Sequence, residues 1–143
     1  MPDYVVDGDR KVLGRMGSLV AKQLLNGNNV SVVNAEKVVI SGHMDDIFAK
    51  YKRMVELTDK ANPEHAPYWS RRPDLFVKRV IRGMLPYKKP RGKQAYRKLR
   101  VYIGVPEGLK SKKTHDLKAK TPDRMYETAV TVKELTESLG YKA

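Results

Sequence analysis

Two runs of β-branched residues, at 30–33 and 38–40, constrain the fold of this chain more than any other feature of its sequence. Val30–Val33 and Val38–Ile40 show little of the apolar and polar alternation that marks a strand with one face in water. Such runs are typical of strands that are covered on both faces in a parallel sheet. With the helical segments around them, they predict an alternating α/β fold.

Three amphipathic segments lie around these runs and predict helices. The first, LGRMGSLVAKQLLNG at 13–27, ends at Asn26-Gly27. The second, at 45–57, begins with Asp45 and Asp46, which suit the positive end of a helix. The third begins near Pro73, a residue favoured in the first helical turn. The stripes that we expect to face the core are Met16, Leu19, Val20 and Leu24; Ile47, Tyr51, Met54 and Val55; and Phe76, Val77, Val80, Ile81 and Met84.

The remaining elements are shorter. We expect strands at Tyr4–Val6 and Leu99–Ile103, a short helix at 91–98, and a stiff, extended loop between Pro86 and Pro90. A C-terminal helix is predicted by TVKELTESLGYK at 131–142, where Thr131 and Glu134 have capping-box spacing and Gly140 lies beyond the end.

The length of 143 residues, without an internal repeat or a break in composition, predicts one domain over 1–143. Within it we distinguish a basic segment at 68–100 and an extended tail at 105–143. The polar stretch 107–123 is expected to lie extended on a surface.

The positive charge of the chain is concentrated in one segment. Of 29 basic and 16 acidic residues, Arg71–Arg100 holds 12 basic residues and one acid, Asp74, which leaves 17 basic and 15 acidic residues elsewhere. A solvated charged face usually mixes both signs, whereas a local excess of cations creates a field that attracts polyanions. The segment therefore predicts nucleic-acid binding.

The candidate RNA contacts are the cations of this segment and a second patch near the N-terminus. Lys78, Arg79 and Arg82 are within one helical turn of each other, opposite the apolar stripe. Gly83 and Gly92 are expected to permit a tight turn or a close approach. The candidates are Arg71, Arg72, Lys78, Arg79, Arg82, Lys88, Lys89, Arg91, Lys93, Arg97, Lys98 and Arg100, with Arg10, Lys11 and Arg15 as the second patch.

Three aromatic residues flank the cations and are candidates for stacking on unpaired bases: Tyr68, Trp69 and Tyr87. The alternative for Trp69, which we favour, is packing in the core under the helix that begins at Pro73. For Tyr68 and Tyr87, stacking on RNA bases and packing within the protein both stay open.

The sequence offers little support for catalysis, a metal or a cofactor, and we expect none of these. It has no cysteine, and no pair of its histidines, His43, His65 and His115, has metal-ligand spacing. Ser41-Gly42-His43 lacks a nucleophile-elbow motif and is read as the end of a strand. Gly14-x-x-Gly17 is too short for a dinucleotide fingerprint, and no P-loop lysine is present.

No apolar run approaches the roughly 18 residues of a membrane span, and MPDYVVDGDR at the N-terminus lacks the features of a signal peptide. We therefore expect a soluble, intracellular protein without a membrane partner or a small-molecule substrate.

Three stretches resemble the universal large-subunit ribosomal protein thirteen family: RGMLPYKKPRGKQAYRKLRVYIG at 82–104, VVNAEKVVISG at 32–42 and KVLGR at 11–15. The resemblance covers residues 4 to about 105, and PYWSRRPDLFVKRVIRGMLPYKKPRG is more similar to the archaeal and eukaryotic branch than to the bacterial one. The residues that match the family hallmark are Ile81, Gly83, Met84, Leu85, Pro86, Gly92, Lys93, Leu99, Val101, Tyr102 and Gly104.

This resemblance implies a three-layer α/β/α fold around a four-stranded, mostly parallel sheet, with a basic helix-loop-helix extension and a C-terminal helix. It also implies a structural role in the cytoplasmic large ribosomal subunit, where the chain would bind ribosomal RNA, contact neighbouring proteins and support assembly. The alternative from another class is an RNA-directed α/β enzyme or nucleotide-binding domain, which would use the basic segment to hold its substrate.

Overall fold

The apolar runs of the sequence form the strands of the structure, a computed structural model that describes residues 3–115 and 128–142. The strands are β1 (Asp3–Asp7), β2 (Asn29–Val33), β3 (Val39–Ser41), β4 (Leu99–Val101) and β5 (Ala129–Thr131). The α-helices are α1 (Leu13–Leu25), α2 (Met44–Glu56), α3 (Pro73–Met84), α4 (Pro90–Arg97), α5 (Glu107–Lys110) and α7 (Val132–Ser138), and two short 3₁₀ helices are η1 (Ala35–Lys37) and η2 (Pro63–His65).

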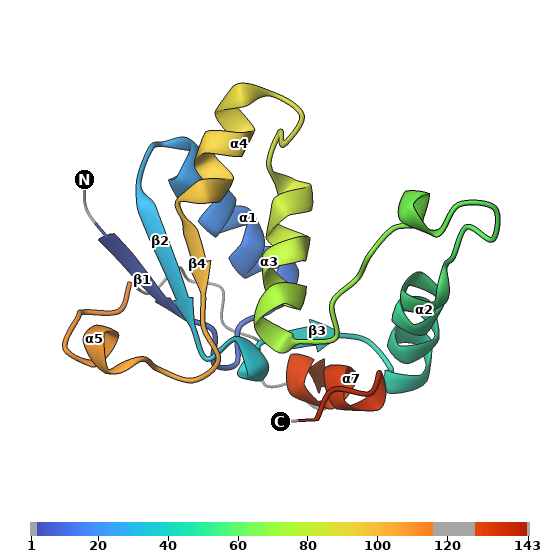
Figure 1. Ribbon diagram of the computed structural model, residues 1–143. Coiled ribbons are helices and arrows are strands. Elements are labelled where there is room, and N and C mark those ends of the chain that lie inside the picture. The colour runs from blue at the N-terminus through green and yellow to red at the C-terminus, as the bar shows by residue number, and fades with distance from the viewer. Residues whose placement is uncertain (1–2, 116–127, 143) are drawn as a thin grey trace.

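Strands β1, β2 and β4 form a parallel sheet in the order β1-β2-β4. Val6 is paired with Val32, and Val30 with Leu99, so these side chains point to the same face. Figure 1 shows α1, α3 and α4 side by side on this face. The parallel pairing is therefore confirmed for the run at 30–33, which forms β2, and the chain has the mixed α/β character that we expected.

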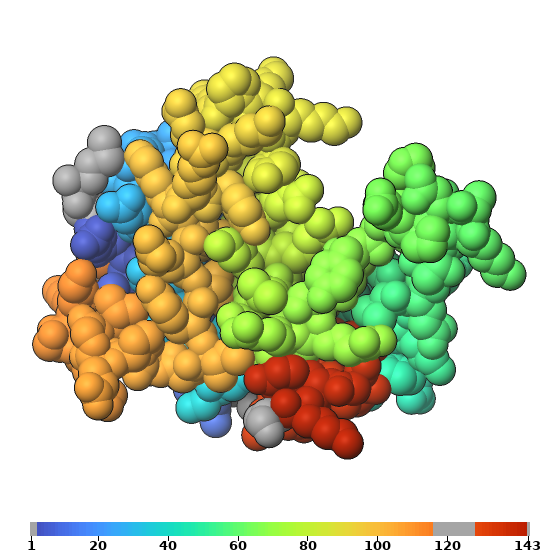
Figure 2. Space-filling view, viewed as in Figure 1, coloured from blue at the N-terminus to red at the C-terminus, as the bar shows by residue number. Residues whose placement is uncertain are grey.

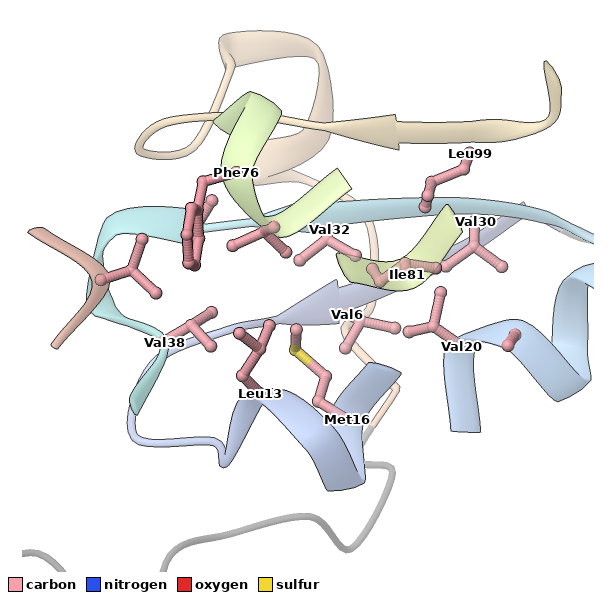
Figure 3. Close-up of a cluster of buried hydrophobic side chains, with 14 of the residues drawn as sticks. Val6, Leu13, Met16, Val20, Val30, Val32, Val38, Phe76, Ile81 and Leu99 are labelled. Carbon is pink, nitrogen blue, oxygen red and sulfur yellow. The ribbon is translucent and has the colours of Figure 1, made fainter. Parts of the chain in front are cut away.

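The core lies between the sheet and these helices (Figure 3). Met16 and Val20 of α1 are fully buried against Val6, Val32 and Ile81. The helices α1 and α3 approach closely at Gly17, where an added Cβ would lie 2.9 Å from Sδ of Met84. The helical spacing of the apolar residues thus places one stripe of each helix in the same core.

The four-stranded, three-layer arrangement that the resemblance implied is not confirmed. The parallel sheet of the described residues has three strands, and β3 instead pairs antiparallel with β5, with Val39 opposite Thr131. Only single parallel bridges extend the pairing, from Val12 to Val39 and from Val5 to Thr114. A β-branched run predicts a buried strand but carries no information on which partner it will find.

The C-terminal helix α7 is capped as the sequence predicts. Thr131 accepts a hydrogen bond from the backbone N–H of Glu134, whose side chain accepts one from the backbone N–H of Thr131. Gly140 follows the helix with a φ of +109°. Val132 and Leu135 are fully buried in the core beside η1, α2 and α3. This part of the expected extended tail 105–143 therefore belongs to the packed body.

Three finer expectations need correction. Met84 is 37% exposed, although Phe76, Val77 and Ile81 of the same stripe are buried. The strand after α4 ends at Val101 rather than at residue 103. In the polar stretch 107–123, Glu107–Lys110 forms α5, while residues 116–123 lie outside the described residues. In the first two cases the apolar pattern continues past the point where burial or strand pairing ends, whereas in the third a polar stretch forms a short helix.

None of the helices within residues 3–115 and 128–142 combines the length and the apolar character needed to cross a bilayer.

Candidate nucleic-acid interface

Helix α3 separates its cations from its apolar residues. Phe76, Val77 and Ile81 are at most 1% exposed and face the core. Because residues three and four apart share a face, Lys78, Arg79 and Arg82 are directed away from that core and are partly exposed. Pro73 stands at the first turn, where its missing N–H costs no hydrogen bond.

A tight turn joins α3 to α4. The backbone N–H of Lys89 donates to the carbonyl oxygen of Pro86 at 2.9 Å, so residues 86–89 are bent rather than extended as we expected. Gly92 of α4 packs against this turn, since an added Cβ would lie 2.0 Å from the carbonyl oxygen of Pro86. Lys88 and Lys89 are exposed at its tip. Figure 2 shows that the turn and the start of α4, in yellow, project from the body.

Aromatic rings support the cations of α3. Nζ of Lys78 lies 5.0 Å from the ring centroid of Tyr96, and the guanidinium carbon of Arg82 lies 4.2 Å from that of Tyr87. The two tyrosine rings contact each other edge to face at 5.4 Å. Such cation–π contacts hold long side chains in place without neutralising their charge. The role of Tyr96 could not be predicted from the sequence, because its contacts with Lys78 and Tyr87 depend on how α3 and α4 pack.

Among the described residues, the cations of α3, the turn and α4 have no acidic partner. We call the surface that they form the α3–α4 basic surface; it consists of Lys78, Arg79, Arg82, Lys88, Lys89, Arg91 and Lys93. None of these seven side chains forms an ion pair with another described residue. The one acid of the segment, Asp74, is bound by Arg72 at 2.9 Å. The surface is therefore a concentrated positive charge that no carboxylate of the described residues offsets.

The other cations of the basic segment lie elsewhere. Arg100 alternates with the core residues Leu99 and Val101, so it points to the opposite face of the sheet, where it is exposed. Lys98 is partly buried and donates to the carbonyl oxygen of Gly27 at 3.0 Å. A block that is continuous in sequence is thus divided between two faces of the molecule.

The remaining members of the block are exposed. Arg71 and Arg72 precede α3, and Arg97 ends α4. Arg71 lies beside the C-terminal end of α7, with Cδ 3.8 Å from the position that a Cβ on Gly140 would take.

The second predicted patch is smaller than expected. Arg10 and Arg15 are exposed, but Lys11 is only 4% exposed. The backbone N–H of Val39 donates to the carbonyl oxygen of Lys11 at 2.9 Å, which ties this stretch to β3 and encloses Lys11. Lys11 is therefore not a surface cation.

The three aromatic candidates differ in exposure. Tyr68 is 79% exposed. Trp69 is partly buried, packs on Tyr51 and Phe76 with centroid distances of 5.9 Å, and has the guanidinium of Arg79 over its ring at 5.3 Å. Trp69 thus packs against the core, as we favoured. Its ring also makes a cation–π contact with Arg79. Tyr87 is partly exposed beneath Arg82.

The residues that we considered as candidates for catalysis or nucleotide binding lie in helices or strands, or directly beside them. Ser41 ends β3, and His43 precedes α2. Gly14 and Gly17 lie inside α1 rather than in a loop, and Gly17 packs on α3. Asp45 and Asp46 are in the first turn of α2, as expected. Within the described part of the chain, no cluster of three or more histidine, cysteine or acidic residues is suited to hold a metal ion.

Comparison with a protein-family model and with individual known proteins points to the same family. Residues 3–107 match the family model described as Ribosomal protein L13. The chain is 41% identical to the large ribosomal subunit protein uL13 of Archaeoglobus fulgidus over 140 residues, which cover 96% of this chain and 88% of the relative. It is 43% identical to the protein of the same name from Methanococcus maripaludis over 139 residues, 96% of this chain and 98% of the relative. The chain therefore belongs to the ribosomal protein L13 family.

Proposed function

We propose that this chain is a structural constituent of the large ribosomal subunit that binds ribosomal RNA through the α3–α4 basic surface and supports subunit assembly. The role in the large subunit follows from membership of the family and from the names of the relatives. In this role the chain also contacts neighbouring large-subunit proteins. We propose that residues 1–143 act as one domain.

The observation that carries the RNA-binding site is that the seven cations of α3, the turn and α4 have no acidic partner among the residues that the structure describes. Lysine and arginine neutralise RNA phosphates and release the counterions condensed on them. Folded RNA is recognised mainly through its shape, its phosphates and its 2′-hydroxyls, which suits a surface rich in donors. The core side of α3 fixes these donors to a rigid body, so little freedom is lost on binding.

The proposed RNA contacts extend beyond this surface. Arg71 and Arg72 continue it at the start of α3, and Arg10 and Arg15 form a separate patch. Arg97 and Arg100 line a hollow of about 310 Å³ between the strands and α5, where Lys112 is paired with Asp3 at 3.3 Å. We therefore propose that the RNA contacts the molecule on more than one side.

The enzymatic alternative is set aside because the family is a structural, non-enzymatic component of the ribosome. The two glycines that suggested a nucleotide loop, Gly14 and Gly17, lie inside α1. Gly17 permits the close contact of α1 with Met84 of α3.

Replacing Lys88, Lys89 and Lys93 together with alanine tests the site. All three side chains are exposed, so the fold should be kept. Each lost phosphate contact should reduce the slope of log affinity against log salt by about 0.7–0.9, so we expect a slope that is smaller by about 2–3 in filter binding to large-subunit RNA.

The matched control replaces Lys37, Lys60 and Lys142 with alanine, which removes the same charge from exposed positions elsewhere. If both triple variants lose affinity equally, the RNA senses only net charge, and the assignment of the α3–α4 basic surface is wrong.

A further inference from the structure

A cleft of about 710 Å³ lies between α2 and the α3–α4 turn. In Figure 2 it is the hollow between the green and the yellow parts of the surface. Tyr51 and Met54 line it from α2, and Trp69 lines it from the segment before α3. Val80 and Leu85 complete its apolar floor. Its volume is in the range of roughly 300–1,000 Å³ that is typical of sites for small ligands.

All the charged residues among the described residues that line the cleft are cationic. Lys50, Arg79, Arg82, Lys88 and Lys89 line it, and none of the described lining residues is acidic. Lys50 belongs to α2 and lies 38 positions before Lys88, so the sequence did not place it with the basic segment. The cleft thus combines an apolar, aromatic floor with positive charges contributed by α2, α3 and the α3–α4 turn.

The guanidinium groups are held in place at the cleft. Arg79 lies over Trp69, and Arg82 lies over Tyr87 at 4.2 Å from the ring centroid. Both arginines are partly buried. Guanidinium planes and aromatic rings are the groups on which proteins stack unpaired bases. These pairs therefore form a prepared stacking platform rather than mobile surface charges.

Gly83 leaves one wall of the cleft without a side chain. It lies inside α3, where glycine is less favourable than alanine by roughly 0.5–1 kcal/mol, yet an added Cβ would meet no atom within 4 Å. The packing of the protein therefore does not require glycine at this position. An occupant that approaches the backbone of α3 would require it.

We propose that this cleft binds one unpaired nucleotide of the RNA, with its base on the aromatic floor and its phosphates on the cationic rim. The inference rests on the proposed function and adds the form of RNA that the site recognises. A base within a duplex is stacked and cannot enter, so the nucleotide comes from a loop, a bulge or a strand end. The positive rim favours a nucleotide over an uncharged apolar side chain of a protein.

Trp69 is the single tryptophan of the chain and lines the cleft, so its fluorescence reports occupancy directly. The full chain is titrated with hexaadenylate and, separately, with an abasic oligomer that carries the same number of phosphates. We expect hexaadenylate to quench the emission of Trp69 and to bind about fivefold or more tightly than the abasic oligomer. Equal affinities, or quenching by both oligomers, would overturn the proposal. This comparison requires no substitution.

A matched pair of variants locates the site. Gly83→Leu fills the open wall and keeps every charge, while Gly14→Leu adds the same side chain to α1 at a position with equally open space. We expect Gly83→Leu to lower the affinity for hexaadenylate about fivefold and to leave that for the abasic oligomer unchanged. Gly14→Leu should change neither. An equal effect of both substitutions would contradict the assignment.

The outcomes separate this inference from the proposed function. If the chain fails to bind large-subunit RNA, the proposed function itself is wrong. If it binds that RNA but does not distinguish bases from abasic sugars, only the nucleotide site is wrong. Quenching of Trp69 by hexaglutamate, with displacement of hexaadenylate, would instead assign the cleft to an acidic segment of a neighbouring protein.

Discussion

Gly92 shows how a single residue shapes the proposed RNA surface. Its Cα faces the carbonyl group of Pro86, and a Cβ would lie 2.0 Å from that oxygen and 2.8 Å from the backbone nitrogen of Tyr87. Both atoms belong to the main chain, so they cannot move aside as a flexible side chain would. The turn that presents Lys88 and Lys89 therefore depends on glycine at this position.

We expect Gly92→Ala to lower the free energy of unfolding by about 1–3 kcal/mol, because the new methyl group forces the turn away from α4. Urea denaturation followed by circular dichroism measures the effect. Gly14→Ala is the control: its added Cβ meets nothing, and alanine should raise stability by roughly 0.5–1 kcal/mol. Equal stability of Gly92→Ala and the original chain would show that the turn is not fixed by this contact.

Tyr51 gives the molecule a pH dependence under alkaline conditions. Its burial beside Trp69 and Phe76 raises the pKa of the phenol above the ordinary value of 10.0. Above about pH 10 the unfolded chain loses this proton while the folded chain retains it. The contribution of Tyr51 to stability is therefore intact below that pH and is lost as the pH rises toward the folded pKa.

We expect Tyr51→Phe to reduce the loss of stability on going from about pH 9 to about pH 11, since the ring contacts remain and the ionisable group is gone. Urea denaturation at both pH values, with and without the substitution, measures the difference. A loss of the same size in both proteins would mean that the phenol of Tyr51 is as accessible in the folded state as in the unfolded state.

At the scale of elements, helix α3 joins the core to the proposed interface. The spacing of its apolar and basic residues predicted one face toward the core and one face toward solvent. Phe76, Val77 and Ile81 are buried as expected. At the end of this stripe Met84 packs on Gly17 of α1, but it remains 37% exposed because the helix ends there. The apolar period of a helix identifies the buried face but not the point at which that face leaves the core.

Ile81→Ala should lower the free energy of unfolding by about 2–5 kcal/mol, because it removes fully buried methyl groups. Met84→Ala should lower the free energy of unfolding by less than half as much, since the side chain of Met84 is 37% exposed. The comparison is made by urea denaturation of both variants. Equal losses would mean that the end of α3 is packed as tightly as its middle.

At the scale of the whole molecule, residues from distant parts of the sequence form one core. Val6 of β1 and Leu135 of α7 belong to the same buried cluster although nearly the whole chain separates them. Helix α7 contacts α2, α3 and η1. The packed core that supports the α3–α4 basic surface therefore includes the C-terminal helix α7.

We expect Leu135→Ala to destabilise the chain by about 2–5 kcal/mol, and the emission of Trp69 to change together with circular dichroism during unfolding. Lys133→Ala, an exposed position on the same helix, serves as the control and should have little effect. If the two signals change at different urea concentrations, the C-terminal part unfolds separately, and the proposal of one domain over residues 1–143 fails.

The sequence by itself determined the local elements and the sign of the charge. Helical spacing and the capping box at Thr131 act between residues that are close in the chain, so they can be read without the fold. The tertiary structure alone decided the antiparallel pairing of β3 with β5, the burial of Lys11 and the meeting of Lys50 with the α3–α4 turn. Each of these depends on which distant segments come into contact, and no local pattern of residues encodes that choice.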